Sequence, residues 1–298
     1  MNGMMDPTAY NALAQYDVGT VMSTEYQHRG YSNCSHRIDT DQGSFLFREF
    51  LSKSRPPIEQ EFILLAALQG HGCPTAHPIS SNSGSTLTEV DGRLFGVFPF
   101  LGGAEPPLTP ATARDIGRAA GHLSLMPPVA GFDAVLKGSW GNALRFVETH
   151  RASEIPASQQ AFLREEGQRF KQDLPTDLPL GIIHADLFPD NVLFKDGQLV
   201  AVLDFEEAAV DTLLLDLGVA INGFCFPDNT LDHELMDALV GGYKEHRPLS
   251  KREKDHQSIY IRYGLFGILY WHLSHPSTAS DNRQSTRIEE LMQRYRGL

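Results

Sequence analysis

The sequence predicts an α+β protein built from two unequal lobes. Its first third is rich in strand-like segments and carries one strong helix pattern, whereas most of the remainder repeats apolar residues at helical spacing. Between them lies GGAEPP, residues 102–107, whose glycines and prolines are typical of a flexible joint. We therefore assign residues 1–101 to a small antiparallel β lobe and residues 102–298 to a larger, mostly helical lobe.

Composition and charge narrow the class of protein and its partners. A chain with 41% hydrophobic and 21% charged residues is typical of a globular protein with a buried core. The formal net charge of −12 argues against nonspecific binding to nucleic acid and against docking on an anionic membrane. The sequence has no apolar run of roughly 18 residues, as a spanning helix needs, and no signal-peptide pattern at its start. Three cysteines without a C-x-x-C pair indicate reduced thiols, so we expect a cytoplasmic protein.

The first lobe is expected to begin with a short helix within residues 10–22 that ends near Gly19. The next segment predicts two strands around the turn Asp41-Gln42-Gly43, because HRI and FLFREF suit pleated structure. Pro56-Pro57 then opens a helix that runs through IEQEFILLAALQ and closes at Gly70 or Gly72. Two further strands, STLTEV and RLFGVFPFL, complete this lobe.

The second lobe is expected to be helical apart from one hairpin. Four segments carry apolar residues at helical spacing: TPATARDIGRAAGHLSLM, QQAFLREEGQRFKQDL, DTLLLDLGVAINGF and DHELMDALVGGYKEH. The exception is HADLFPDNVLFKDGQLVAVLDF, residues 184–205. In it Asp196-Gly197 lies between two apolar runs, which predicts a β-hairpin.

Three polar residues, Asp186, Asn191 and Asp204, flank the strands of this apolar hairpin. Asn191 precedes the first strand and Asp204 follows the second, so antiparallel pairing brings them to within about 5–8 Å of each other. An amide oxygen and a carboxylate at that separation suit Mg²⁺ together with phosphates. Asp186, on the loop before Asn191, can face the same mouth and accept a proton from an attacking hydroxyl. Taken singly, each residue is also typical of a turn or a helix cap.

The spacing of these residues distinguishes between the two interpretations. His184-Ala185-Asp186-Leu187 followed by Asn191 fits the catalytic-loop pattern H-x-D-L-x-x-x-N, and Asp204-Phe205 comes 18 residues after Asp186. Both features resemble those of protein-kinase-like phosphotransferases. We therefore predict that Asp186 is a catalytic base and that Asn191 and Asp204 bind Mg²⁺. No G-x-x-x-x-G-K-[ST] motif occurs, which excludes a P-loop kinase.

A site of this kind needs a pocket for ATP in the first lobe. Arg48 lies in the middle of the FLFREF strand, where protein kinases have a lysine that grips the phosphates and pairs with a helix glutamate. Glu61 is the expected partner, and an ordinary solvent-facing charge is the alternative for Arg48. The loop RGYSN has a single glycine, so its phosphate donors would be the amides around Gly30 and the side chain of Ser32 or Asn33.

The base of the nucleotide is expected at the joint, where VFPFLGG leaves the last strand of the first lobe. There Pro99 can offer a carbonyl but no N–H, and Leu101 can offer an N–H. The acceptor is expected to be a small molecule, because Asp216 follows Asp204 by only 12 residues and no A-P-E motif occurs. The chain therefore has no platform for a protein substrate.

Longer segments carry a specific resemblance. IIHADLFPDNVLF, AVLDFEEA, DTLLLDLGVAI and NGFCF closely resemble the aminoglycoside phosphotransferase/choline kinase superfamily, and within it the homoserine kinase branch. The similarity extends over nearly the whole chain. It implies a bilobal protein-kinase-like fold and transfer of the ATP γ-phosphate to a small metabolite, with L-homoserine as the first candidate. It also implies that His184 braces the catalytic loop and that Asp216 ties this loop to the helix that follows it.

Two departures from this branch leave the acceptor open. Glu206 stands where homoserine kinases would have tyrosine, and glutamate there looks more like choline and ethanolamine kinases. Trp271 stands where the branch would have a Ser-Arg pair, which leaves Arg262 as the cation of its segment. An amino-acid acceptor needs an anion for its ammonium group, which Glu206, Glu207 or Asp211 would supply. Its carboxylate needs a cation, which Arg262 would supply.

Choline, ethanolamine, another amino alcohol or an aminoglycoside is the alternative acceptor. A choline-type acceptor would prefer an aromatic cage around its cationic group. Part of a cage is available from one late helix, although core packing is the alternative for the same residues: Tyr260, Tyr263, Tyr270 and Trp271.

Two other classes of protein provide alternative interpretations. The H-x-D sequence at residue 184 could begin a metallohydrolase site, and His71, Cys73 and His77 offer nitrogen and sulfur ligands at short spacing. The latter three also suit a polar turn between a helix and a strand. A kinase fold that binds without catalysing would be expected to lack part of the catalytic set, whereas this chain retains all three of its polar residues.

Overall fold

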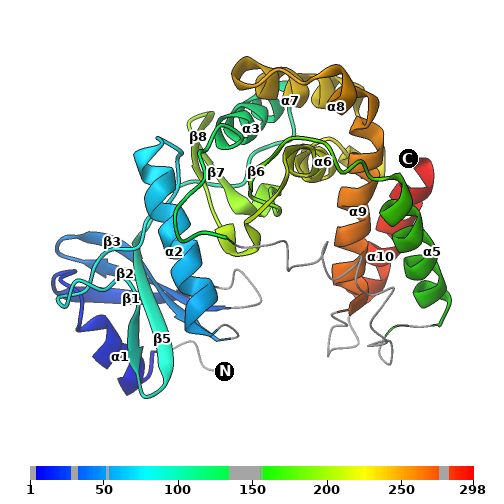
Figure 1. The fold of residues 1–298 in the computed structure, drawn as a ribbon. Helices are drawn as coiled ribbons and strands as arrows, with labels where there is room; N and C mark the ends of the chain where they lie inside the picture. Colours follow the sequence, from blue (N-terminus) through cyan, green and yellow to red (C-terminus); the bar gives the residue numbers. More distant parts are fainter. Residues whose placement is uncertain (1–4, 28–32, 52–53, 134–154, 156, 275–281) are drawn as a thin grey trace.

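The protein is described by a computed structural model that covers residues 5–27, 33–51, 54–133, 155, 157–274 and 282–298. A lobe that contains a β-sheet lies at one end of the molecule and a larger group of helices at the other (Figure 1). None of the helices described is both long enough and apolar enough to cross a membrane.

The first lobe contains a five-stranded sheet in the order β1-β2-β3-β5-β4, and every neighbouring pair is antiparallel. The turn between β4 and β5 consists of Asp91 and Gly92, both with positive φ, as tight hairpins require. The strands are β1 (Val21–Gln27), β2 (Asn33–Thr40), β3 (Gly43–Phe50), β4 (Thr88–Val90) and β5 (Arg93–Pro99).

Two helices cover opposite faces of this sheet. α1 (Pro7–Leu13) packs into one apolar cluster with Phe47 of β3. α2 (Arg55–Gly70) packs on the other face, where Phe62 contacts Phe50 edge to face, 5.9 Å between ring centroids. Successive side chains of a strand point to opposite faces, so the sheet buries residues on both sides.

The extent of the first helix was predicted wrongly. The expected helix lies within residues 10–22 and ends near Gly19, whereas α1 begins at Pro7 and ends at Leu13. The start signal lies earlier than expected, because the Asp6 side chain accepts a hydrogen bond from the amide of Ala9 and Pro7 follows the cap. The segment VMSTEYQ, residues 21–27, contains valine, threonine and tyrosine, which favour strands. It pairs with β2 as strand β1.

The second lobe is mainly helical. α6 runs through its centre, and every residue of α6 except Gly223 is buried, as expected for a helix that is apolar all round. The helices described here are α3 (Pro110–Leu123), α5 (Ala157–Asp173), α6 (Leu213–Phe224), α7 (His233–His246), α8 (Lys251–Asp255), α9 (Gln257–Ser274) and α10 (Asn282–Gly297).

Two short antiparallel strand pairs interrupt the helices. β6 (Leu180–Ile183) pairs with β9 (Ala209–Thr212), which holds together the segments before the catalytic loop and before α6. β7 (Val192–Lys195) pairs with β8 (Gln198–Val202) in the predicted hairpin, and both Asp196 and Gly197 of its turn have positive φ. Single turns of 3-10 helix flank these strands or follow α6: η1 (Pro189–Asn191), η2 (Phe205–Glu207) and η3 (Pro227–Asn229).

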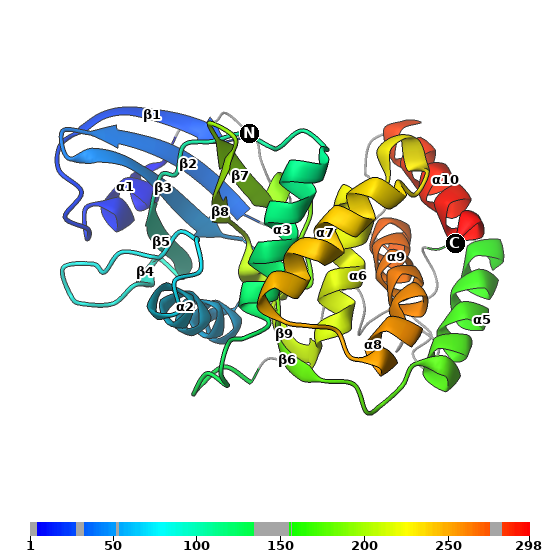
Figure 2. The ribbon, with the colours of Figure 1, turned by 90° about the horizontal axis from the view of Figure 1, so that it is seen from above.

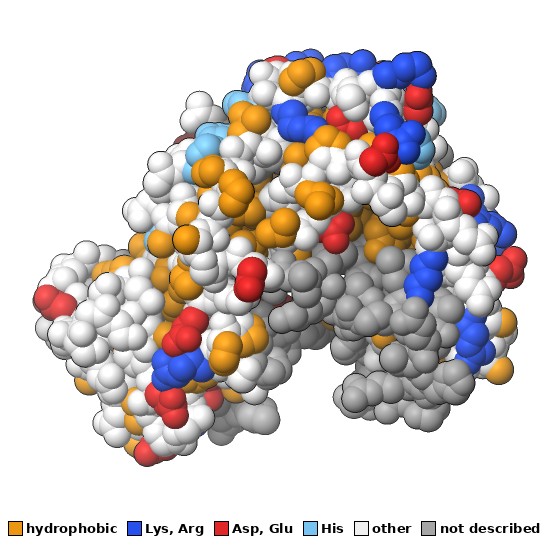
Figure 3. Space-filling view, viewed as in Figure 1, with side chains coloured by type: hydrophobic (Ala, Val, Ile, Leu, Met, Phe, Trp, Pro, Cys, Tyr) orange, Lys and Arg blue, Asp and Glu red, His pale blue; other side chains and the backbone are white. Residues whose placement is uncertain are grey.

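Lysine and arginine side chains gather over α7 and α8 at the top of the molecule (Figure 3). Several basic residues in and beside this region are in ion pairs. Arg114 and Arg118 both contact Glu245, and Lys251 contacts Asp255. Acidic neighbours therefore offset part of the positive charge at this end of the protein.

α3 and α7 lie side by side in very close contact (Figure 2). Glycines make the contact possible, because a Cβ built on Gly117 would lie 1.9 Å from the carbonyl oxygen of Leu239. A Cβ on Gly242 would lie 2.0 Å from the carbonyl oxygen of Arg114. Backbone oxygens cannot move aside as the end of a flexible side chain can, so these two positions require glycine.

Replacing Gly117 with Ala is expected to lower the free energy of unfolding by about 1–3 kcal/mol, since the new methyl group forces α3 and α7 apart. Urea denaturation of the purified protein measures this loss. The matched control is Gly70→Ala at the end of α2, where an added Cβ meets nothing within 4 Å. The control should be neutral or slightly stabilising, and an equal loss in both variants would contradict the packing argument.

Candidate active site

His184 follows β6 directly and is completely buried. Its Nδ1 accepts a hydrogen bond from the amide of Asp186 at 3.1 Å, so the proton of the neutral ring is on Nε2. Nε2 then donates to the carbonyl oxygen of Leu203 at 2.8 Å. Burial lowers the pKa of His184, which favours this neutral form. The ring thus joins the catalytic loop to the end of β8, the bracing role predicted for it.

Asp216 ties the catalytic loop to α6, as predicted. Its Oδ1 accepts a hydrogen bond from the amide of Ala185 at 2.8 Å. Ala185 has a φ of +63°, a left-handed conformation that costs a non-glycine residue free energy and needs support from its surroundings. Burial raises the pKa of Asp216, while His184 and the loop amides oppose that change.

Asn191 positions Asp186. Its amide nitrogen donates both to the main-chain oxygen of Asp186 at 2.8 Å and to Oδ2 of the same residue at 2.7 Å. The amide oxygen of Asn191 is thereby turned away from Asp186 and remains the group that can coordinate a cation. Leu203, which precedes Asp204, donates its amide hydrogen to the carbonyl of Asn191 at 2.8 Å, so the two ends of the hairpin lie together.

Asp204 has a left-handed backbone, with φ +62° and ψ +70°. Its Oδ1 is buried and has no hydrogen-bond partner in the part of the chain that the structure describes. A buried carboxylate oxygen without a donor is uncommon and calls for a partner. The donor set suits a divalent cation, since a carboxylate and the amide oxygen of Asn191 are oxygen ligands and the two hairpin ends that carry them lie together. We call the region formed by Asp186, Asn191 and Asp204 the catalytic mouth.

The catalytic mouth is strongly acidic. Burial raises the pKa of the Asp186 carboxyl to about 8, and the negative charge of Asp204 adds to this effect. Asp190 and Glu207 raise it further, whereas the hydrogen bond from Asn191 lowers it. A cation at the mouth would relieve this repulsion and favour the ionised form of Asp186.

Arg48 lies at the centre of β3, opposite Gly96 of β5. Its guanidinium lies over the ring of Phe98, 5.5 Å from the centroid, and its buried Nε has no hydrogen-bond partner among the residues described. Glu61 is buried on α2, but no ion pair joins it to Arg48 in the described structure. Arg48 therefore retains a donor for an anionic ligand, and its pairing with Glu61 stays a prediction.

The chain between β1 and β2 was expected to cover the phosphates. Gly30 and Ser32 lie outside the described residues. Asn33 is the first residue of β2, and its side-chain Oδ1 is buried without a hydrogen-bond partner among the described groups. Its position at the end of this loop is the one predicted, and its contact with a nucleotide stays a prediction.

The joint between the lobes is attached to the catalytic hairpin. β5 ends at the exposed Pro99, and the amide of Phe100 donates to the carbonyl of Ser44 on β3 at 3.0 Å. Three residues after the half-buried Leu101, Ala104 and Phe194 of β7 exchange both of their backbone hydrogen bonds, at 2.8 and 2.9 Å. The joint thus runs from the sheet to the hairpin, and the contact of Pro99 and Leu101 with the base of a nucleotide stays a prediction.

The predicted acceptor residues do not all gather at the catalytic mouth. Glu206 and Glu207 lie on η2 directly after Asp204, and it is Glu207 whose charge acts on Asp186. Asp211 lies on β9, where its Oδ1 accepts from the amide of Thr212 at 2.6 Å. Burial raises its pKa.

Arg262 faces α5 and α10. Its guanidinium is 3.9 Å from the buried carboxylate of Glu166 and lies over the ring of Tyr295, whose hydroxyl donates to Glu166. These residues border a cavity of about 540 Å³ between α5, α9 and α10. Of the aromatic residues proposed for a cage, Tyr260 and Tyr263 are buried in the core, so they do not form a cage around a ligand.

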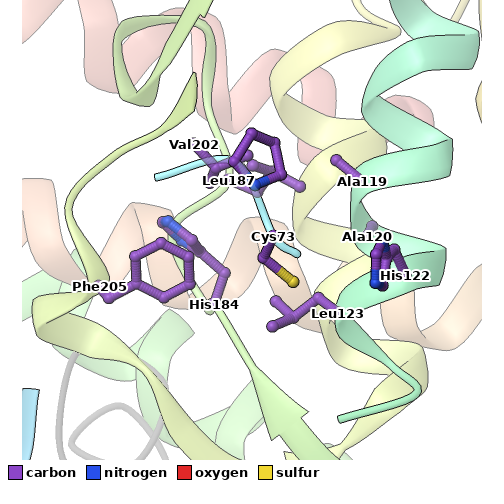
Figure 4. A pocket seen from close by; sticks show the side chains of 10 residues that line it. Cys73, Ala119, Ala120, His122, Leu123, His184, Leu187, Val202 and Phe205 are labelled. Carbon is purple, nitrogen blue, oxygen red and sulfur yellow. The ribbon is translucent and has the colours of Figure 1, made fainter. Parts of the chain in front are cut away.

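A small apolar cavity lies behind the catalytic loop (Figure 4). It has a volume of about 20 Å³ and is lined by His184 and Phe205 on one side, whose ring centroids are 4.5 Å apart, and by Cys73 and α3 on the other. Burial raises the pKa of the Cys73 thiol to about 11, so it remains protonated at neutral pH. The back of the catalytic loop is thus supported by apolar packing and not by a second polar site.

The metallohydrolase alternative lacks its ligands. His77 is committed to the carbonyl of Leu65 at 3.0 Å, and the His71 ring packs against His122 at 4.9 Å between centroids. Nowhere in the described part of the chain do three or more His, Cys, Asp or Glu side chains gather in a group that could hold a metal ion.

Several contributors to the site were not predicted from the sequence. Asp190 and Glu207 add charge around Asp186, and Glu207 had been considered only as a general anion for the acceptor. The carbonyl of Leu203 and the ring of Phe205 hold His184. The position of Asp190 inside the catalytic-loop pattern could have indicated that its charge lies near Asp186. The contact with the Leu203 carbonyl could not be predicted, because every residue has a backbone carbonyl.

The fold and the catalytic mouth are those of a protein-kinase-like phosphotransferase. Residues 27–249 match the family model described as the phosphotransferase enzyme family, so the chain belongs to that family. It is an enzyme of the small-molecule kinase type. The resemblance of the sequence to the aminoglycoside phosphotransferase/choline kinase superfamily is thereby confirmed.

Among curated relatives, a homoserine kinase from Caulobacter sp. is 32% identical over 253 residues, 82% of this chain and 78% of the relative. A homoserine kinase from Methylocella silvestris is 32% identical over 255 residues, 81% and 77% of the two chains. Among solved structures, an amicoumacin kinase superposes with a TM-score of 0.79 at 14% identity, over 98% of this chain and 93% of that one. A microcompartment-associated aminopropanol kinase superposes with a TM-score of 0.75 at 22% sequence identity, over 96% of this chain and 94% of that one. These superpositions confirm the predicted bilobal α+β fold.

Replacing Asp186 with Asn is expected to stabilise the metal-free protein at high pH. The pKa of Asp186 is raised from 3.8 to about 8 in the folded state. The folded protein therefore holds a proton that the unfolded chain has released, and wild-type stability falls as pH rises from about 4 to 8. Asparagine escapes this loss, so at pH 9 its Tm should exceed that of the wild type by about 2–5 °C, and by less at pH 5.

Thermal denaturation in the presence of a chelator measures both proteins, and added Mg²⁺ should reduce the difference by stabilising the wild type. A variant that melts below the wild type at both pH values would show that the ionised carboxylate is well accommodated in the metal-free mouth.

Proposed function

We propose that this enzyme uses Mg²⁺ and ATP to phosphorylate the hydroxyl group of a small metabolite, with L-homoserine as the acceptor. The observation that carries the proposal is the catalytic mouth. There Asn191 orients Asp186 by two hydrogen bonds, and beside them Asp204 keeps a buried oxygen without a donor. A base that is positioned next to a cation site is the arrangement that phosphoryl transfer to a hydroxyl requires.

Each residue of the mouth has a separate role in the proposal. Asn191 and Asp204 hold the divalent cation, which when bound neutralises charge on the ATP phosphates. Asp186 accepts a hydrogen bond from the acceptor hydroxyl, aligns it for attack and takes its proton as the new bond forms. His184 and Asp216 keep the loop that carries Asp186 in its left-handed conformation. Catalysis then comes from positioning and electrostatics.

The first lobe supplies the nucleotide contacts in this proposal. Arg48, with its buried donor, pairs with the phosphates, and Glu61 orients Arg48 when the nucleotide is bound. Pro99 and Leu101 meet the edge of the base, while Gly30, Ser32 and Asn33 cover the phosphates. The similarity to the amicoumacin kinase supports the choice of ligands, because that protein was solved with AMP-PNP and Ca²⁺. On this view residues 1–101 form the nucleotide lobe, and residues 102–298 carry the base, the cation ligands and the acceptor.

Homoserine is favoured as acceptor by the relatives, which carry that name and align over about four fifths of this chain. The acidic surroundings of Asp186 suit the ammonium group of an amino acid, with Glu206, Glu207 or Asp211 as its partner. The carboxylate of homoserine is assigned to Arg262. Because Arg262 already lies 3.9 Å from Glu166, it must turn from that residue or share its charge with the ligand.

An amino alcohol is the second candidate acceptor, and the position of Arg262 favours it. A molecule with an ammonium group and a hydroxyl but no carboxylate needs only the acidic mouth. The aminopropanol kinase that superposes on this chain carries such a substrate in its name. We further infer that the enzyme acts in the cytoplasm and has neither a nucleic acid nor a membrane as partner. The net charge of −12 and the three free thiols support this inference.

Asp186→Ala and Asp204→Ala are each expected to lower kcat by at least about 10³-fold, since one removes the base and the other a cation ligand. A coupled assay of ADP release measures the rate. The control is Asp237→Ala on the exposed side of α7, which removes the same charge far from the mouth and should keep wild-type turnover. Turnover within tenfold of wild type in either mouth variant would refute the assignment.

An ATP-consumption screen tests the acceptor. The panel is homoserine, choline, ethanolamine, 1-amino-2-propanol, hydroxylysine and an aminoglycoside, each with Mg²⁺ and a no-acceptor blank. We expect the highest kcat/KM for homoserine, and Arg262→Ala should raise its KM about tenfold or more while leaving that of an amino alcohol unchanged. A rate for homoserine at the blank level would reject this acceptor and leave the kinase assignment in place.

A further inference from the structure

One face of the sheet in the first lobe is turned toward α2, and the strand register identifies its side chains. β2 and β3 pair so that Arg48 lies opposite Ser35 and Leu46 lies opposite Arg37. Residues that are paired across an antiparallel ladder share a face, as do residues two apart on one strand. Arg37, Leu46 and Arg48 therefore project from the same side of the sheet.

The spacing of these residues matches the dimensions of a nucleotide. Two residues along a strand correspond to about 7 Å, comparable to the separation between the base of a nucleotide and its nearest phosphate. With Arg48 at the phosphates and the base at the joint, the base lies under the row that contains Leu46 and Arg37. Phe98 of β5 is paired with Leu46 and continues this row toward the joint.

The guanidinium of Arg37 is held in a fixed orientation beside the joint. Its Nε donates to Oδ1 of Asp39 at 3.0 Å, and its Nη2 lies 2.9 Å from the same oxygen. Asp39 also accepts hydrogen bonds from the hydroxyls of Ser44 at 2.6 Å and Ser23 at 3.1 Å. The guanidinium lies over the ring of Phe100, 4.7 Å from its centroid, and Phe100 is the residue between the two that were assigned to the edge of the base.

The side chain of Arg37 is accessible to a ligand, and its planar guanidinium can stack on a flat aromatic ring. Its side chain is 36% exposed although it lies inside the sheet. Glu25 of β1 lies opposite it in the ladder and Asp39 contacts it, so its positive charge is largely balanced. A balanced guanidinium attracts phosphates weakly, but its planar face still stacks on aromatic rings.

We propose that Arg37 is a base-recognition residue, whose guanidinium stacks on the face of the purine of ATP beside Phe100. The inference rests on the proposed function, because it requires a nucleotide at the joint. In this proposal two arginines contact different parts of the nucleotide: Arg48 binds the phosphates, and Arg37 stacks on the base.

The test compares two ligands by isothermal titration calorimetry: ATP, and inorganic tripolyphosphate, which has three phosphates but no base. Both are titrated with Mg²⁺ into the wild type, Arg37→Leu and Arg55→Leu. Arg55 is a matched control, since it is an exposed arginine in a 2.7 Å ion pair with Glu89 and its loss changes the net charge equally. Arg37→Leu should weaken ATP binding about 3- to 30-fold and change tripolyphosphate binding less than twofold. Arg55→Leu should change neither affinity more than twofold.

Three outcomes would overturn the proposal, and they differ in meaning. Equal weakening of ATP and tripolyphosphate would make Arg37 a phosphate ligand. ATP binding by Arg37→Leu as tight as by Arg55→Leu would make it a surface charge. A wild-type protein that binds neither ligand would remove the proposed function as well. If thermal denaturation shows that Arg37→Leu does not fold, Arg37→Gln replaces it, with the same selective loss of ATP affinity expected because glutamine lacks the guanidinium group that stacks on the purine.

Discussion

The structure depends on holding two carboxylates, Asp186 and Asp204, beside each other against their mutual repulsion. Both positions are unfavourable for a negative charge, since each carboxylate is partly withdrawn from water and lies near the other. The surrounding chain supplies the restraint through buried groups on other elements. His184 joins the catalytic loop to the end of β8, and Asp216 joins it to α6.

This arrangement also accounts for the parts of the site that could be predicted from the sequence. A hairpin between Asn191 and Asp204 brings its two ends together by strand geometry alone, so the proximity of these residues followed from their spacing. Alternation along a strand likewise fixed the side of the sheet from which Arg48 projects. The bilobal architecture followed from a change in periodicity at a glycine- and proline-rich joint. In each case a local rule determined the result.

Other features could not be predicted because they depend on contacts between distant segments. The direction of Arg262 is set by α5 and α10, and its position in the sequence indicates only that it lies on a helix. The first helix begins at Pro7, earlier than expected, because the side chain of Asp6 caps it, and the end of the helix at Leu13 has no equally clear signal in the sequence. The hydrogen bond that fixes the tautomer of His184 ends on a main-chain carbonyl, which every residue possesses. Sequence patterns therefore predicted which residues come together at the mouth, but they did not predict where the residues proposed to bind the acceptor would lie.

The backbone pairing of Ala104 with Phe194 has a consequence for how the two lobes are joined. It adds the joint to the β7–β8 hairpin as a third strand-like segment, so the chain at Ala104 is attached to the hairpin that lies between Asn191 and Asp204. A Cβ on Gly103 would already touch Leu193 and the carbonyl of Phe194, which fixes that residue to the hairpin as well. Gly102 is less confined, because an added Cβ there meets nothing within 4 Å. A second attachment follows α2, where the amide of Val202 on β8 donates to the carbonyl of Pro74 at 2.8 Å, so two separate segments hold the hairpin to the first lobe.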